Sequence, residues 1–201
     1  MTKILILSGH PRPESFTEHL AKSYQNGANK AGFETELFKL HELNLSQKAI
    51  AQKPTSNDWS PQLTALWEAF EQADHVMIAH PLWWGSMPGE LKMLFDRLLV
   101  SGKAYSYEEG KPLPLGHLVG RTAEIFMTSD TPNWFYKLGY KSAQTNLMKN
   151  QILKFIGLKP ARFTHISPVR TMSDTERQRQ IEKAFQLGQI APKTVKQKSA
   201  A

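Results

Sequence analysis

The sequence predicts an α/β fold, a doubly wound sheet of five parallel strands with helices on both faces. Apolar runs of strand length alternate with amphipathic helical segments five times along the chain, as they do in βαβ units. The run at 76–79 is too short for a typical helix and suits a buried strand. It leads through a turn rich in Trp, Pro and Gly into a helix with Leu91, Leu94 and Leu98 on one face. Right-handed crossovers, and two ligand-type loops that must lie side by side, favour the strand order 2-1-3-4-5.

The first third of the chain carries a clear helix-start signal. Ser15 and Glu18 have the spacing of a capping box, and the helix they start ends at Gly32. The expected elements up to the central strand are a strand at 3–7, a helix at 15–31, a strand at 33–40, a long loop at 41–60 that can hold a short helix, and a helix at 61–73.

The rest of the chain continues the alternation. Gly157 followed by Pro160 is typical of a helix end, and Ser173 with Glu176 forms a second capping box. The expected elements are a helix at 87–99, a long loop at 101–118, a strand at 122–127, a mostly helical segment at 135–156, a strand at 161–166 and a helix at 173–187. A loop as long as 101–118 inside a compact domain is usually functional.

Length and composition bound the class of protein. The 201 residues fit one domain, which we expect to span 1–190, followed by a basic, disordered tail at 191–201. The absence of cysteine excludes disulfides, thiol catalysis and thiolate metal sites. The sequence contains neither a signal-peptide core nor an apolar run of membrane-spanning length, so we expect a cytoplasmic protein without stable membrane insertion.

The net charge of +7 raises the question of nucleic-acid binding. Part of the excess lies in the tail, at Lys193, Lys196 and Lys198, and the remaining basic residues are scattered over predicted helix faces. This distribution favours a solvated basic surface that attracts anionic small molecules. We therefore expect no nucleic-acid partner.

The loop after the first strand has the features of a phosphate site. It leads into a helix N-terminus, where backbone N–H groups and the helix dipole attract anions. The hydroxyls of Ser15 and Thr17, with His10 or Arg12, can complete such a site. The loop matches neither a P-loop nor a dinucleotide-binding fingerprint. The alternative is that Ser15 only caps the helix and that His10 is an ordinary loop residue.

The turns after two later strands add aromatic and polar groups. The first turn offers aromatic walls and backbone donors, and the second offers small hydroxyl side chains and a covering indole. As alternatives, the tryptophans of the first turn belong to a core or an interface, and Asp130 or Thr131 is the N-cap of a helix. The residues of the two turns are Pro81, Leu82, Trp83, Trp84 and Gly85, and Thr128, Ser129, Asp130, Thr131 and Trp134.

Together the three loops describe a phosphate pocket, a slot for a planar ring and a polar edge, at the carboxyl ends of neighbouring strands. This combination indicates a flavin mononucleotide site. No cluster of His and Glu has the spacing of a metal site, so we expect no metal. Ser8 lacks the context of a hydrolase nucleophile.

Four segments of the sequence resemble the flavodoxin-like NAD(P)H:quinone oxidoreductases. They are ILILSGHPRPESFT, PLWWGSMPGELKMLFDR, GKAYSYEEGKPLPLGHLVGR and MTSDTPNWF, within a likeness that runs from Ile4 to about Leu187. The resemblance implies a flavodoxin-like fold, a tightly bound FMN or FAD, and a homodimer with active sites at the subunit interface. FMN is expected ahead of FAD, because the chain lacks an obvious module for the adenosine half.

The resemblance also assigns roles to residues. His10, Ser15, Phe16 and Thr17 match the phosphate-contacting loop, and residues 81–85 match the segment along the isoalloxazine ring. Residues 128–131 replace a Thr-Thr-Gly-Gly type turn, with Asp130 and Thr131 in place of the glycines. Members of the family use a Tyr and a following His for proton delivery. Tyr136 can fill the first role, and no His follows it nearby in the sequence.

The expected activity is a two-electron reduction, in which hydride passes from NAD(P)H through the flavin to a quinone or a similar aromatic acceptor by a ping-pong mechanism. The alternative is a flavin-binding electron carrier or the regulatory subunit of a membrane transporter. For the homodimer, apolar residues beyond the apparent needs of one sheet face, together with the loop at 101–118, predict the subunit contact. These apolar residues are Trp67, Phe70, Leu91, Leu94, Phe95, Leu98 and Leu99.

Overall fold

The protein, as seen in a computed structural model that describes residues 1–45, 56 and 59–190, is built on one central parallel sheet. Its strand order is β2-β1-β3-β6-β7, which is 2-1-3-4-5 in the chain order of these strands. The predicted fold class and strand order are therefore confirmed. The strands are β1 (Lys3–Ser8), β2 (Glu34–Lys39), β3 (His75–Pro81), β6 (Thr122–Thr128) and β7 (Lys159–Ile166).

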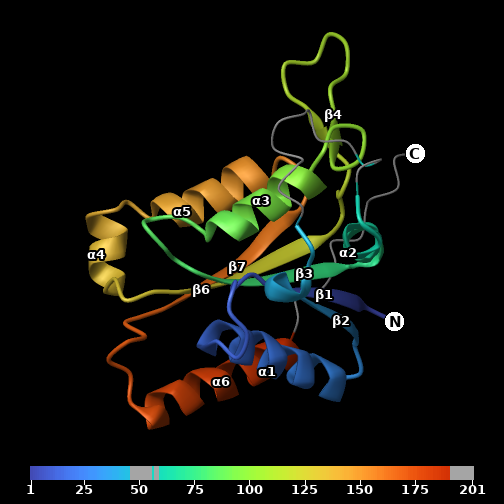
Figure 1. Ribbon diagram of the computed structural model, residues 1–201. Coiled ribbons are helices and arrows are strands. Elements are labelled where there is room, and N and C mark those ends of the chain that lie inside the picture. The colour runs from blue at the N-terminus through green and yellow to red at the C-terminus, as the bar shows by residue number, and fades with distance from the viewer. Residues whose placement is uncertain (46–55, 57–58, 191–201) are drawn as a thin grey trace.

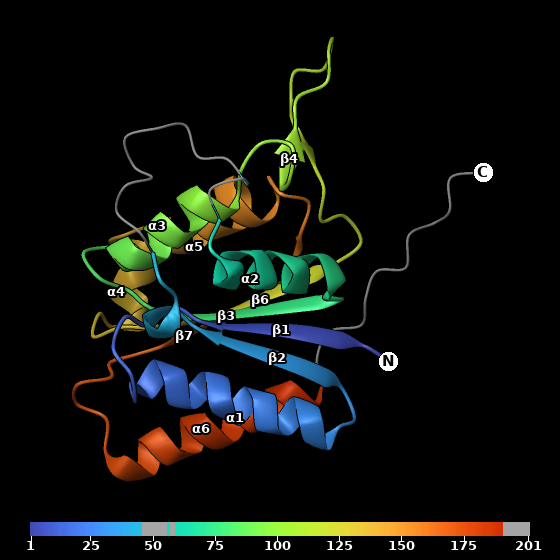
Figure 2. The same cartoon turned by 45° about the vertical axis from the view of Figure 1, so that its right-hand side comes forward.

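Helices cover both faces of the sheet (Figures 1 and 2). One face carries α1 (Phe16–Lys30) and α6 (Asp174–Gln189). The other carries α2 (Pro61–Gln72), α3 (Gly89–Leu98), α5 (Ala143–Asn146) and the π-helix η4 (Leu147–Leu153). Two short elements complete the described helices, the 3-10 turn η1 (Leu40–Glu42) and α4 (Asn133–Leu138) beyond the end of the sheet.

The start of α1 follows the sequence signal in part. Ser15 is the N-cap, and its hydroxyl accepts a hydrogen bond from the N–H of Glu18. The reciprocal bond of a capping box is not formed, because the Glu18 carboxylate pairs with Lys22 and His41. The second predicted box is confirmed, since Ser173 and Glu176 exchange both bonds at the start of α6.

The segment predicted to be mostly helical, 135–156, is interrupted. α4 stops before Gly139, and Lys141 and Ser142 then take positive φ values of 48° and 53°. Left-handed backbone breaks a helix, so α5 starts on a new axis. The predicted end is confirmed, because Gly157 has a φ of 94° in the turn before β7.

Residues 101–118, predicted to be a loop, contain a small hairpin. β4 (Tyr105–Ser106) and β5 (Leu115–Gly116) pair antiparallel, and the connection between them stands away from the domain at the top of Figure 1. The ring of Tyr105 packs edge-on against Phe155, with centroids 4.8 Å apart. The hairpin is therefore attached to the helical layer at its base.

The apolar residues assigned to a subunit contact mostly serve the protein's own core. Trp67, Phe70, Leu91, Leu94 and Leu98 are each no more than 2% exposed and pack under the α2–α3 layer. That part of the prediction is wrong, because the parallel sheet is buried on both faces and needs a full apolar layer on each.

Two sequence expectations concern whole-chain properties. No helix in the described part of the chain has the length and apolar character needed to cross a bilayer. The predicted disordered tail, 191–201, lies outside the described residues.

Candidate functional site

The largest concentration of the predicted site residues lies in a cleft at the carboxyl ends of β1, β3 and β6. The strand order reverses between β1 and β3, so that the chain leaves β1 toward α1 on one face and leaves β3 toward α3 on the other. Ligands bind at such switch points in open α/β sheets. The cleft has a volume of about 440 Å³ and is lined by His10, Arg12, Pro13, Glu14, Ser15, Phe16, Thr17, Pro81, Leu82, Trp83, Thr128, Ser129, Asp130, Val169 and Arg170.

His10 is held in one orientation in the loop between β1 and α1. It is 5% exposed, its Nδ1 accepts the backbone N–H of Arg12, and its ring meets the edge of Trp83 at 5.4 Å. Burial, and then the charge of Arg12, lower the pKa of His10. The ring is therefore neutral at pH 7, with its proton on Nε2, where it can donate to an anion.

The N-terminus of α1 supplies further donors. The N–H groups of Phe16 and Thr17 stand in the first turn, where a helix contains no carbonyl partner for them. The hydroxyl of Thr17 is hydrogen-bonded to that of Thr128, with the two oxygens 2.8 Å apart. This buried contact joins the first loop to the end of β6, so two of the predicted loops are fixed against each other.

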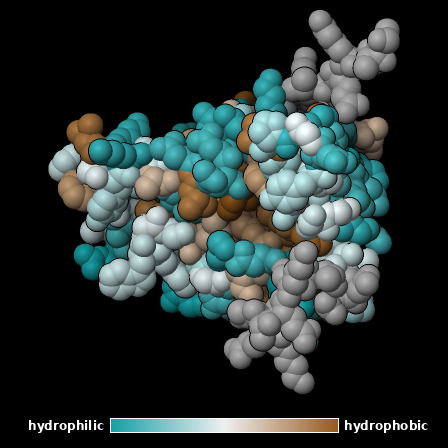
Figure 3. Space-filling view, turned by 90° about the horizontal axis from the view of Figure 1, so that it is seen from above, coloured by the Kyte–Doolittle hydropathy of each residue, from teal (hydrophilic) through white to brown (hydrophobic). Residues whose placement is uncertain are grey.

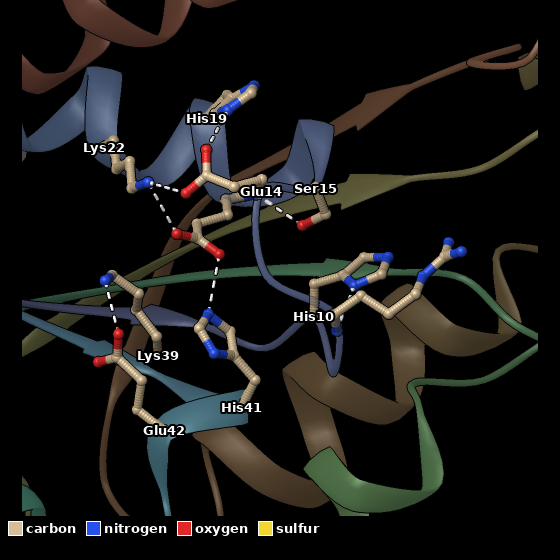
Figure 4. A network of polar contacts seen from close by, with 10 residues as sticks. His10, Glu14, Ser15, His19, Lys22, Lys39, His41 and Glu42 are labelled. Carbon is tan, nitrogen blue, oxygen red and sulfur yellow. Dashed lines mark hydrogen bonds and ion pairs between the residues drawn. The ribbon is translucent and has the colours of Figure 1, made fainter.

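A carboxylate lies unexpectedly close to these donors. Glu18 is 1% exposed, makes an ion pair with Lys22 at 2.9 Å and forms a hydrogen bond with Nε2 of His41 at 3.0 Å (Figure 4). Burial raises the pKa of Glu18, but hydrogen bonds from Lys22 and His41 outweigh it, and the pKa lies below its usual value. The charge of Lys22 and the hydrogen bond from His41 therefore offset a negative charge that would otherwise repel an anion at the start of α1.

Lys22 extends the same network outward. It also binds Glu14, which accepts from His19 as well. Hydrogen bonds from Lys22 and then His19 lower the pKa of Glu14 to about 2. The exposed Glu14 is a lining residue of the cleft, and this network fixes its position.

The turn after β3 is a tight one. Trp83 and Ser86 exchange both backbone hydrogen bonds, and the two residues between them, Trp84 and Gly85, have φ values of 49° and 79°. These values define a two-residue type I′ turn. Trp83 faces the cleft, whereas the side chain of Trp84 is fully exposed.

The turn after β6 forms the polar edge. The hydroxyl of Ser129 accepts the N–H of Thr131 and is 2.7 Å from Nε2 of His165. Asp130 accepts the N–H of Arg170. The alternative of an N-cap is wrong, because Pro132 is the N-cap residue of α4 and no side chain caps it.

Four cleft residues were not among the predicted ones: Pro13 and Glu14, which lie within the predicted first loop, and Val169 and Arg170, which lie outside all three loops. Val169 and Arg170 come from the connection after β7, where the N–H of Val169 donates to the carbonyl of Ser129. The only signal for them was their position just after a strand, because every strand of a parallel sheet ends at the same edge.

Five predicted site residues do not line the cleft. Trp84 and Gly85 form the tip of the turn, Thr131 supplies backbone contacts to Ser129, and Trp134 on α4 is 65% exposed. Tyr136 is 3% exposed, and its hydroxyl accepts the N–H of Thr145. A histidine that is distant in sequence lies beside Tyr136, since the ring of His165 on β7 is 4.7 Å from that of Tyr136.

The fold agrees with comparisons to known proteins. The chain matches, over residues 2–187, a family described by its flavodoxin-like fold, and it belongs to this family. The family predicted from the sequence motifs is thus confirmed.

The relatives include an uncharacterized NAD(P)H oxidoreductase of Haemophilus influenzae, 26% identical over 188 residues that cover 90% of this chain and 92% of that protein. An FMN-dependent NADH:quinone oxidoreductase of Ruminiclostridium cellulolyticum is 27% identical over 206 residues, with 92% and 95% covered. The crystal structure of Smu.1420 from Streptococcus mutans superimposes with a TM-score of 0.79 at 28% identity, covering 94% of this chain and 99% of the other.

Proposed function

We propose that this protein is an NAD(P)H-dependent flavin oxidoreductase of the quinone reductase type, with FMN as its cofactor. The observation that carries the proposal is the convergence of loops from β1, β3 and β6 on one cleft, where the hydroxyls of Thr17 and Thr128 join two of them. Relatives of similar length are named NAD(P)H oxidoreductases and FMN-dependent NADH:quinone oxidoreductases, which supports the same activity.

The donor set of the cleft suits the phosphate of FMN. Neutral His10 can donate from Nε2, the first turn of α1 presents N–H groups, and Arg12 and Arg170 line the cleft. Trp83 supplies an aromatic wall and Ser129 a polar edge. FMN is proposed over FAD, because relatives of this chain are named FMN-dependent NADH:quinone oxidoreductases.

A bound flavin would supply the chemistry, because it accepts a hydride from NAD(P)H and passes two electrons on to an acceptor. The residues of the chain bind and orient, and none needs to be a strong acid or base. Because the Trp83 turn and the Ser129 turn line the same cleft, we propose that donor and acceptor occupy it in turn. This alternation gives a ping-pong mechanism, with quinones as the proposed acceptors.

The flavin content of the purified protein tests this proposal. We expect a yellow protein that releases FMN on heating, identified by chromatography, and whose absorbance bleaches when NADH is added without oxygen. Recovery of no flavin, even after reconstitution with FMN, would refute the proposal.

A pair of variants tests the phosphate position. Ser15→Ala with Thr17→Ala removes two hydroxyls from the cleft and should weaken FMN binding at least tenfold. Ser173→Ala is the matched control, because it also removes an N-cap, worth about 1 kcal/mol, but does so at α6, outside the cleft. If both variants bind FMN as the wild type does, the phosphate lies elsewhere.

We also propose a homodimer. This proposal does not rest on the apolar residues of α2 and α3, because these residues are buried in the protein's own core. Seen from the side that carries α3 and η4, the surface is hollowed and its floor is hydrophobic (Figure 3). This groove of about 930 Å³ is lined mainly by Phe95, Leu99, Val100, Tyr105, Leu147, Ile152, Phe155 and Ile156. A second copy that covers it would bring its hairpin residues toward the partner. Sedimentation at micromolar concentration tests the proposal, and an active monomer would refute it.

A further inference from the structure

A small cavity lies between the sheet and the α5–η4 layer, apart from the cleft. It is lined by His80 of β3, Ile125 and Met127 of β6, Gln144 and Thr145 of α5, Met148 of η4, and Phe163, Thr164 and His165 of β7. Its volume is about 10 Å³. A cavity of roughly 10–15 Å³ on this measure holds one water molecule, provided that two to four polar groups face it.

Three residues of this cavity each have a buried polar atom without a hydrogen-bond partner among the described residues. The atoms are Nε2 of His80, Nε2 of Gln144 and Nδ1 of His165. His80 is 0% and Gln144 1% exposed. An unpartnered buried polar atom costs about 1–3 kcal/mol, so three at one place indicate a missing shared partner.

The sheet register places the two imidazoles on the same face of the sheet, on either side of Met127. His80 pairs with Met127, and Met127 pairs with His165, so the three residues form one row across β3, β6 and β7. Residues in such a row project from the same face of the sheet. The two histidines are therefore two strands apart, about 10 Å between backbones, with Gln144 above them on α5.

The other hydrogen bonds of these three side chains determine whether each unpartnered atom is a donor or an acceptor. Nδ1 of His80 lies 2.9 Å from the carbonyl of Pro81 and must donate to it, so Nε2 of this neutral ring is an acceptor. Oε1 of Gln144 accepts from Ser86, and its Nε2 remains a donor. The hydroxyl of Ser129 donates to the carbonyl of Thr131, so His165 donates from Nε2 and accepts at Nδ1.

We propose that this cavity binds one ordered water molecule, and that His165 is thereby a positioning residue for Ser129. The water donates to Nε2 of His80 and to Nδ1 of His165, and it accepts from Nε2 of Gln144. These three bonds satisfy all three atoms at once. The size of the cavity and the sets of donors and acceptors point to the same occupant.

The proposed water would affect two turns that line the cleft, the Ser129 turn and the Trp83 turn. The water bond at Nδ1 keeps the His165 proton on Nε2, which orients the Ser129 hydroxyl at the polar edge. Gln144, through its bond from Ser86, attaches the Trp83 turn to the same water. The effect on a bound flavin rests on the proposed function, whereas the water site does not.

The water site is tested first in the flavin-free protein. We expect electron density within hydrogen-bond distance of the three atoms, and ¹⁵N spectra in which His165 carries its proton on Nε2. Gln144→Met should lose the water and mix the His165 tautomers, whereas Met148→Leu, which changes an apolar wall of the same cavity, should retain both. Density without a water, or a proton on Nδ1, overturns the proposal, and the wild type alone decides this if the variant does not fold.

The positioning role is tested separately in flavin-reconstituted protein. His165→Gln keeps a donor at the place of Nε2, and His165→Leu removes it. We expect the Leu variant to bind FMN several-fold more weakly and to change its absorption spectrum, with both readouts restored in the Gln variant. Equal behaviour of the two variants overturns the positioning role, and binding of no flavin by the wild type refutes the proposed function instead.

Discussion

Acid should destabilise this protein through His80. The side chain is fully buried, and burial lowers its pKa from 6.5 to about 4, while its bond to the carbonyl of Pro81 opposes the shift. The unfolded chain takes up a proton below pH 6.5, and the folded protein does so only below about pH 4. The free energy of unfolding therefore falls as the pH decreases from 6.5 to 4, and this group has no effect above that range.

The size of the loss follows from the pKa difference. One pKa unit corresponds to about 1.36 kcal/mol, so the shift of His80 gives a loss of about 3 kcal/mol. His165 acts in the same direction, because burial, and then the charge of Lys137, lower its pKa to about 4 as well. A domain has only about 5–15 kcal/mol of stability in total, so the effect is large enough to measure.

His80→Asn isolates this contribution. The Asn amide can still donate to the carbonyl of Pro81, but it does not titrate. Urea unfolding at several pH values between 7 and 4 should show a pH-dependent loss about 3 kcal/mol smaller in the variant than in the wild type, although the variant is less stable at pH 7. His19→Asn, at an exposed histidine of α1, is the control. If His80→Asn retains the full wild-type pH dependence, the folded protein accommodates the charged ring and the reasoning is refuted.

Three further predictions concern packing and kinetics. Thr128→Val removes the bond to Thr17 and should lower the free energy of unfolding by about 1 kcal/mol, and an unchanged urea midpoint would contradict it. Gly27→Ala places a Cβ 1.9 Å from the carbonyl oxygen of Phe185, so it should cost about 1–3 kcal/mol by pushing α6 away. Gly89→Ala, with no atom within 4 Å, is its control, and equal stability of the two would refute the close approach. Initial rates with NAD(P)H and a quinone should give parallel double-reciprocal lines, and intersecting lines would exclude alternate use of one cleft.

The sequence by itself determined the elements and the edge where they meet. Ser15, Ser173 and Gly157 start or end helices through contacts within a few residues of their own positions. Their effects can therefore be predicted without knowledge of the fold. The three loops could be assigned to one cleft because parallel strands all end at the same edge of the sheet. His10, Thr17 and Trp83 were accordingly found there.

Only the tertiary structure decided the pairings between distant segments. Glu18 takes His41 in place of its capping partner, the α3 stripe fills the core, and His165 reaches Ser129 from β7, the next strand of the sheet along the chain. Such contacts depend on strand register and on how helices sit over the sheet, which set the distance between residues far apart in sequence. Local sequence patterns do not determine these distances. The water-sized cavity between β3, β7 and α5 could therefore be identified only from the tertiary structure.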